Sequence, residues 1–140
     1  MSDVLFAFDV AAAPETVRRA LTTTEGIASF WTADAQVPDQ PGESFVLGFP
    51  DAPLPFDLLL VNADEDNVTW RAQTFPPQWA GTEIRWNISD ADSGSTVSFR
   101  HGSFADDADT ARFAYVWGQV MVQLKSYAET GVAAPVFARS

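Results

Sequence analysis

The sequence contains no cysteine and only one histidine, His101. The lack of cysteine excludes disulfide bonds, thiolate metal sites and cysteine catalysis. A transition-metal site needs several converging ligands, and here only carboxylates accompany the single histidine. The acidic run at residues 64–66 lacks the glycine and the distal glutamate of a calcium-binding loop. The sequence also has no phosphate-binding loop and no dinucleotide fingerprint, so we expect neither a metal ion nor a cofactor.

Basic side chains are scarce, because eight Lys and Arg residues stand against 19 Asp and Glu residues. The formal net charge is −11 and the sequence pI is about 4.1. A surface of this sign repels phosphate backbones and anionic lipids, so we expect no binding to nucleic acid or to membranes. The excess charge serves either solubility or the recognition of a basic partner.

The N-terminal ten residues have no basic segment and include Asp9, which excludes a signal peptide or a membrane span there. We therefore expect a soluble, cytoplasmic protein. A length of 140 residues predicts one domain, residues 1–140, with enough buried surface for a core. Aromatic residues make up 13% of the chain, with 11 Phe, 5 Trp and 2 Tyr. They form either a thick core or the lining of an apolar cavity.

Apolar periodicity predicts a strand at residues 4–10, followed by two short helices. Pro14 suits the first turn of the first helix, and Thr22 with Glu25 resembles a capping box that opens the second helix. Alternating residues then predict antiparallel strands between residues 34 and 102, with turns at residues 64–67 and 92–94 and a proline-rich loop at residues 50–55.

A long amphipathic helix is predicted from about residue 107 to residue 130. Acidic residues at its start suit the positive end of the helix dipole, and Gly131 marks its end. One stripe of this helix is apolar and consists of Phe113, Val116, Trp117, Val120, Met121, Leu124 and Tyr127. The order of elements predicts an α+β fold in which an antiparallel sheet packs against this last helix.

Short motifs along nearly the whole chain resemble those of the helix-grip (START-like, SRPBCC) superfamily. Within it, the sequence is most similar to homologues of the heat-shock-protein-90 ATPase activator. The motifs that carry the resemblance are Ala13-Pro14-Glu15-Thr16-Val17, Glu25-Gly26-Ile27, Phe30-Trp31, Pro41-Gly42-Glu43-Ser44-Phe45, Val68-Thr69-Trp70, Gly81-Thr82-Glu83-Ile84, Thr96-Val97-Ser98-Phe99-Arg100-His101-Gly102, and Trp117 with Leu124-Lys125-Ser126-Tyr127-Ala128-Glu129-Thr130-Gly131.

The resemblance implies a curved sheet that grips the C-terminal helix, with a cavity between them that often takes an apolar ligand. The superfamily includes lipid carriers, cyclases and hydrolases, so the fold alone does not define an activity. We expect a non-enzymatic protein that binds a small hydrophobic molecule or acts as an accessory factor. The alternatives are a chaperone-associated interaction module and an enzyme that uses His101 inside the cavity. The expected protein partner is either a second copy of the chain or a chaperone.

The candidate cavity lining consists of the strand side chains that are expected to face the helix and of side chains from the apolar stripe of the helix. These residues are Phe45, Phe49, Trp70, Trp86, Phe99, His101, Phe113, Trp117, Val120 and Met121. His101 serves either as a hydrogen-bonded core residue or, with Ser103 and a nearby aspartate, as part of a catalytic group. The lining is apolar apart from His101 and the tryptophan N–H groups, which would orient a ligand.

Two further features leave alternatives open. Arg71, Arg85 and Arg100 lie on the polar phase of three strands, where they form either a basic ladder or ion pairs with acids such as Glu83. Gly118 interrupts the long helix, either as a tolerated surface residue or at a seam where a loop or a second subunit approaches closely.

Overall fold

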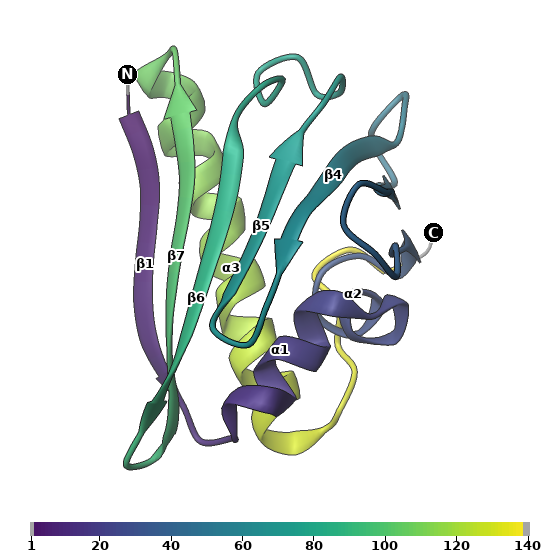
Figure 1. Ribbon diagram of the computed structural model, residues 1–140. Coiled ribbons are helices and arrows are strands. Elements are labelled where there is room, and N and C mark those ends of the chain that lie inside the picture. The colour runs from purple at the N-terminus through teal and green to yellow at the C-terminus, as the bar shows by residue number, and fades with distance from the viewer. Residues whose placement is uncertain (1, 139–140) are drawn as a thin grey trace.

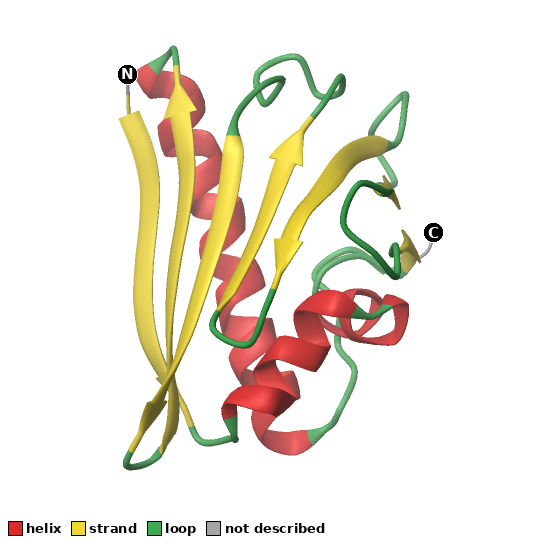
Figure 2. Cartoon of the chain, in the orientation of Figure 1, coloured by secondary structure: helices red, strands yellow, loops and turns green. Residues whose placement is uncertain are grey.

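Seven antiparallel strands form one curved sheet, and a long helix crosses one face of it (Figures 1 and 2). This computed structural model describes residues 2–138. The elements are β1 (Ser2–Val10), α1 (Pro14–Thr22), α2 (Thr24–Phe30), β2 (Asp34–Gln36), β3 (Ser44–Gly48), β4 (Phe56–Ala63), β5 (Asn67–Ala72), β6 (Glu83–Ala91), β7 (Gly94–Phe104) and α3 (Asp107–Thr130). The predicted α+β helix-grip fold is confirmed.

The strand order is β1-β7-β6-β5-β4-β3-β2, so the first strand joins the sheet beside the last one. Strands β2 to β7 follow one another as a meander. The register aligns Phe6 with Phe99 and Phe99 with Trp86, so these rings point to the same face of the sheet. This face is covered by α3 and forms the core, because bulky apolar side chains on one side of a sheet must be buried against another layer.

The ends of α3 agree with the sequence prediction. The Asp106 side chain accepts a hydrogen bond from the backbone N–H of Ala108 and caps the first turn. Gly131 adopts φ 76°, and its N–H donates to the Tyr127 carbonyl, which closes the last turn. In the predicted apolar stripe, four side chains are fully buried and the others are half-buried. The fully buried ones are Trp117, Val120, Met121 and Leu124.

The predicted cap of the second helix was wrong by one residue. Thr22 ends α1, and its hydroxyl donates to the Arg18 carbonyl. The cap is Thr23, whose hydroxyl accepts from the N–H of Gly26. Gly26 lies where α2 closely approaches the α1 backbone. A Cβ at residue 26 would lie 2.3 Å from the carbonyl oxygen of Ala20.

The outer face of the sheet is polar and carries ion pairs. Arg71 and Arg85 both contact Glu83, with N–O distances of 3.0 and 2.7 Å, and Arg100 contacts Asp3 at 2.8 Å. Hydrogen bonds from the two guanidinium groups lower the pKa of Glu83 below its ordinary value. The arginines are therefore paired with acids, as one of the two sequence interpretations predicted. Such exposed pairs contribute little to stability.

After α3, the chain runs back along the end of α2. The Phe137 N–H donates to the Trp31 carbonyl at 2.9 Å, and the Ala33 N–H donates to the Phe137 carbonyl at 2.9 Å. Thr32 and Phe137 thus form a parallel bridge that brings the Phe137 ring to the open end of the core. Within residues 2–138, no helix is long and apolar enough to cross a membrane.

The two helical glycines predict opposite effects of the same substitution. Gly26→Ala should lower the free energy of unfolding by roughly 1–3 kcal/mol, because the added methyl meets the α1 backbone. Gly118→Ala should raise it by about 0.5–1 kcal/mol, because alanine favours a helix interior. At Gly118 the nearest atom to the added methyl is Phe6 Cζ, at an ordinary contact distance of 3.8 Å. Urea denaturation of both variants measures the two signs, and equal signs would contradict the packing described for α2.

Candidate functional site

A cavity of about 410 Å³ opens beside the N-terminal half of α3. Its walls come from the end of α2, the loop after β3, the start of β4, the β5–β6 loop, α3 and the C-terminal segment. The lining residues are Trp31, Phe49, Pro50, Asp51, Ala52, Phe56, Trp79, Arg112, Phe113, Val116, Trp117 and Phe137. The wall is mostly apolar, with Asp51 and Arg112 as its charged members.

Aromatic rings that contact one another fix the shape of this cavity. Trp79 stacks on Trp117 with ring centroids 5.7 Å apart and an interplanar angle of 16°. Phe56 meets Trp79 edge-on at 5.1 Å, and Phe137 meets Phe49 edge-on at 5.0 Å. Offset and edge-to-face pairs of this kind hold their members in defined orientations. The cavity walls are therefore largely fixed before any ligand enters.

The structure separates the sequence-predicted lining into two groups. Phe49, Phe113 and Trp117 border the cavity. The other seven residues are packed in the core and do not border it; they are Phe45, Trp70, Trp86, Phe99, His101, Val120 and Met121.

Close ring contacts show why these side chains leave no gap between the middle of the sheet and α3. Phe45 lies 4.9 Å from Trp70, Trp86 lies 4.7 Å from Phe99, and Phe99 lies 4.6 Å from Trp117, all between ring centroids. The open space lies at one end of the contact, where loops rather than strands face the helix.

Sequence reasoning missed several wall residues because they lie outside the regular elements. Trp31 follows the last residue of α2, and Trp79 lies in the loop after Pro76-Pro77. Phe137 lies in the C-terminal segment, for which the sequence predicted no element. The one sequence signal that could have identified these residues as lining is that they are large and apolar within polar or proline-rich segments. Val116 was recognised as part of the apolar stripe of the helix, but not as lining, and Phe56 falls within the region predicted to form strands.

His101 is fully buried, and both ring nitrogens bond to other side chains. Trp117 Nε1–H donates to His101 Nδ1 at 3.0 Å. The Thr82 hydroxyl donates to the Trp79 carbonyl at 2.6 Å, so its oxygen accepts from His101 Nε2–H at 2.8 Å. This chain of bonds fixes one neutral tautomer and links α3, β7 and the β5–β6 loop.

The hydrogen bonds of His101 do not support its role in a catalytic group with Ser103 and an aspartate. No hydrogen bond joins His101 to Ser103 or to an aspartate among the described residues; its partners are Thr82 and Trp117. Burial lowers the pKa of His101 from 6.5 to about 3. At neutral pH the ring is uncharged and has no free nitrogen with which to take up a proton. Within residues 2–138, no three histidine or acidic side chains are grouped so that they could hold a metal ion.

Arg112 stands at the edge of the cavity and is held by two contacts. Its Nη2 lies 3.2 Å from Asp109 Oδ1, one helical turn earlier. Its Cζ lies 4.8 Å from the centre of the Phe113 ring, so the guanidinium covers a residue that lines the cavity.

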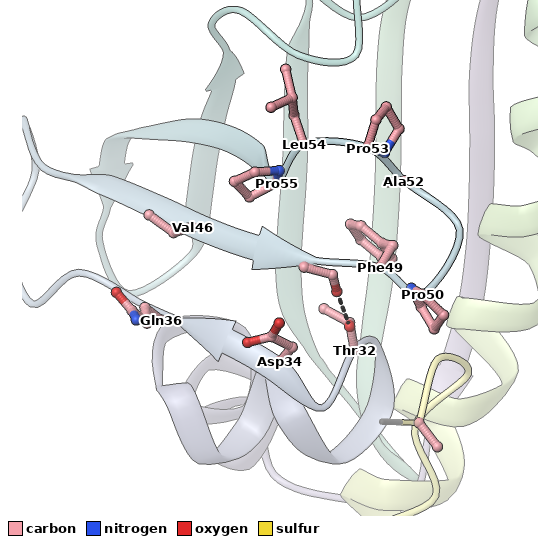
Figure 3. A pocket seen from close by; sticks show the side chains of 12 residues that line it. Thr32, Asp34, Gln36, Val46, Phe49, Pro50, Ala52, Pro53, Leu54 and Pro55 are labelled. Carbon is pink, nitrogen blue, oxygen red and sulfur yellow. Dashed lines mark hydrogen bonds between the residues drawn. The ribbon is translucent and has the colours of Figure 1, made fainter. Parts of the chain in front are cut away.

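A second hollow, which we call the groove, lies on the other side of the proline-rich loop (Figure 3). Its volume is about 640 Å³, and it shares Phe49, Pro50 and Ala52 with the cavity. Its floor is fixed by the Thr32 hydroxyl, which donates to the Gly48 carbonyl at 2.6 Å. Both hollows are partly open, but the lining of the groove mixes polar and apolar residues, whereas the lining of the cavity is mostly apolar and aromatic.

The fold and the cavity define a helix-grip protein. The chain belongs to the family described as Activator of Hsp90 ATPase homolog 1-like protein, whose model matches residues 11–129. The resemblance drawn from the sequence motifs is thereby confirmed. A comparison with curated proteins finds no match.

Several solved structures share the fold. The Aha1 dimer from Colwellia psychrerythraea has a TM-score of 0.83 and 24% identity, over 94% of this chain and 98% of that one. DynU16, from the dynemicin biosynthetic locus, has a TM-score of 0.83 and 20% identity, over 99% of this chain and 51% of that one. An AHSA1-like protein from Aeromonas hydrophila has a TM-score of 0.73 and 14% identity, over 93% and 94%. At these identities the likeness establishes the fold alone.

The buried histidine predicts that stability falls in mild acid. The unfolded chain binds a proton near pH 6.5, whereas native His101 does so only near pH 3, so stability is complete above pH 6.5 and is lost as the pH falls toward 3. Between pH 7 and 5.5 the free energy of unfolding should fall by about 1 kcal/mol. Carboxylates contribute little there, because even in the unfolded chain they titrate mainly below pH 5.

Urea denaturation at several pH values measures this loss, and His101→Gln is the control. The variant should be less stable at pH 7, but its stability should be nearly constant between pH 7 and 5.5. An equal slope in the variant would show that His101 is not the group responsible, since it is the only histidine in the chain.

Proposed function

We propose that this protein binds a small hydrophobic molecule in the cavity beside α3. The observation that carries the proposal is a partly open cavity of about 410 Å³ with a wall made mainly of aromatic rings. Ligand sites of proteins typically have volumes of about 300–1,000 Å³ and apolar linings with a few polar groups. Burying an apolar ligand against these rings removes its surface from water, which favours binding.

The proposed role is binding rather than catalysis. The one histidine is neutral, buried and bonded at both nitrogens, so it serves the core. The charged groups at the cavity, Asp51 and Arg112, lie at its edge and suit the orientation of a ligand. A chaperone partner, which the family description suggests, stays a prediction for this chain.

A neutral fluorescent probe, N-phenyl-1-naphthylamine, tests the proposal without any contribution from charge. We expect its emission to rise saturably with the wild-type protein. Val116→Trp should weaken the affinity at least tenfold, because Val116 lines the cavity and the larger ring fills it. Leu5→Trp is the matched control, since Leu5 lies on the outer face of the sheet and is 66% exposed.

Two results would contradict the cavity as the binding site. One is the absence of saturable binding to the wild-type protein. The other is equal affinity in Val116→Trp and in the control, with both variants folded by circular dichroism. The second result would point to a site elsewhere, such as the groove.

We also infer that the protein self-associates through the outer face of α3. From Phe113 to Leu124 the helix carries no ionisable side chain except Tyr115. Tyr115 and Val122 are 73% and 63% exposed on this face. Two copies that each carry a net charge of −11 repel one another, so a contact between them needs a neutral surface. The Colwellia psychrerythraea structure with this fold is that of a dimer.

Sedimentation velocity tests the dimer. We expect the wild-type protein to sediment as a dimer at about 100 µM, and Val122→Glu or Tyr115→Glu to shift it toward the monomer, because a charge at the contact loses its water. Leu5→Glu adds the same charge to a side chain of similar exposure outside the contact and should leave the dimer intact. A monomeric wild type, or equal dissociation by Leu5→Glu, would contradict this interface.

A further inference from the structure

We propose that the ligand of the cavity is a hydrophobic acid whose carboxylate binds Arg112. This inference rests on the proposed function and deepens it, because it assigns a chemical class to the ligand. The apolar body of such a molecule would lie among the rings of Trp31, Phe56, Trp79 and Phe137, and its charged group would lie at the edge.

The first support is the unused hydrogen-bonding capacity of Arg112. A guanidinium has five N–H donors in a planar fork that matches a carboxylate. Within residues 2–138, Arg112 uses one of its nitrogens, Nη2, on a single oxygen of Asp109 at 3.2 Å. Its side chain is 59% exposed, so the remaining donors are open to a molecule at the cavity. A carboxylate that binds there gains two parallel charge-assisted hydrogen bonds.

The second support is that Arg112 is already held in place. The contact between its Cζ and the Phe113 ring, at 4.8 Å, holds the guanidinium beside the cavity wall. The ion pair with Asp109 further restrains the same group. A side chain that is restrained before binding loses less conformational freedom when it binds. An arginine stacked in this way is therefore a better carboxylate site than a free surface lysine.

The third support is the distribution of the other basic groups. Among residues 2–138, Arg112 is the only basic residue that lines the cavity. The remaining cations in ion pairs lie elsewhere: Arg18 and Arg19 with Glu15, Arg71 and Arg85 with Glu83, Arg100 with Asp3, and Lys125 with Glu129. In a chain of net charge −11, Arg112 is thus the one lining side chain, among the described residues, whose charge attracts an anionic ligand.

Asp51 also lies at the cavity edge and carries a charge opposite to that of Arg112, so it allows a second prediction about the charge of the ligand. Its carboxylate repels an anionic ligand and attracts a cationic one. Removing it should therefore strengthen the binding of an acid. Removing Arg112 should weaken the binding of an acid and leave a neutral molecule unaffected. For a cationic ligand both effects would have the reverse sign, so the signs of the two effects identify the charge of the ligand.

The experiment compares 2-naphthoic acid, which is ionised at pH 7.5, with its methyl ester, which has a similar shape and no charge. Each compound displaces N-phenyl-1-naphthylamine from the wild-type protein in 20 mM and in 150 mM salt. We expect the acid to bind about fivefold more tightly than the ester in low salt, a modest factor because Arg112 is partly exposed to water. The preference should shrink in high salt, because ions screen the charges.

Three variants locate the charge effect. Arg112→Gln should abolish the preference for the acid and leave the acid slightly weaker than the ester, because Asp51 still repels it, and Arg112→Lys should keep part of the preference. Asp51→Asn should strengthen the acid about twofold without changing the ester, in keeping with one exposed charge interaction. Arg100→Gln is the matched control, because it removes an arginine of similar exposure on the outer face.

The outcomes separate this inference from the proposed function. If the dye and the ester bind but the acid has no advantage, the carboxylate assignment is wrong and the hydrophobic site stands. The same conclusion follows if Arg100→Gln abolishes the preference as fully as Arg112→Gln. If neither the dye nor either compound binds, the proposed function itself fails.

Discussion

The position of Trp117 is the constraint on which the rest of the structure depends. Its ring centroid lies within 6.1 Å of those of five other rings, which come from the residue after α2, the β5–β6 loop, β6 and β7: Trp31, Trp79, Trp86, Phe99 and His101. Its N–H needs an acceptor in this apolar setting, and His101 Nδ1 supplies it. The N–H groups of Trp70, Trp79 and Trp86 are buried without a hydrogen-bond partner in the described part of the chain. The Trp117–His101 bond thus sets the rotation of α3 over the sheet.

This constraint explains why the cavity lies where it does. Trp117 and its neighbours pack against one another between the middle of the sheet and the helix. Toward the N-terminus of α3, the facing elements are loops, which do not follow the curve of the strands. Trp79 and Phe137 border the open space without closing it. One surface of Trp117 therefore belongs to the core and another to the cavity, and a change at the core side is transmitted directly to the site.

The sequence predicted the regular elements well because their signals are local. The period of two marked β6 and β7, and Asp106 with Gly131 marked both ends of α3. The predicted cap of α2 was wrong because three consecutive threonines, residues 22–24, offer similar caps, and the sequence pattern does not distinguish between them. The predicted ion pairs around Glu83 followed from the phase of the strands. These successes share one cause, which is that a repeating backbone fixes the direction of its side chains.

The cavity was less predictable, because irregular segments build much of it. Periodicity places Phe45 and Met121 on the inner face, but it does not show whether a ring there meets open space or another ring. Trp79 depends on how the loop after Pro76-Pro77 folds, and Phe137 depends on pairing with the end of α2. Neither arrangement leaves a periodic pattern. The partners of His101, likewise, come from distant parts of the chain and could be identified only in the folded structure.

The pairing of β1 with β7 has a consequence for the kinetics of folding. Val10 opposes Ser95 and Ser2 opposes Phe104, so this ladder joins residues about 90 positions apart in the chain. Contacts of such sequence separation lose much chain entropy before they gain energy, and proteins rich in them fold slowly for their size. The hairpins β4–β5 and β6–β7 close short loops and can form early. We therefore expect β1 to complete the sheet late, which leaves the edge of β7 exposed while the chain folds.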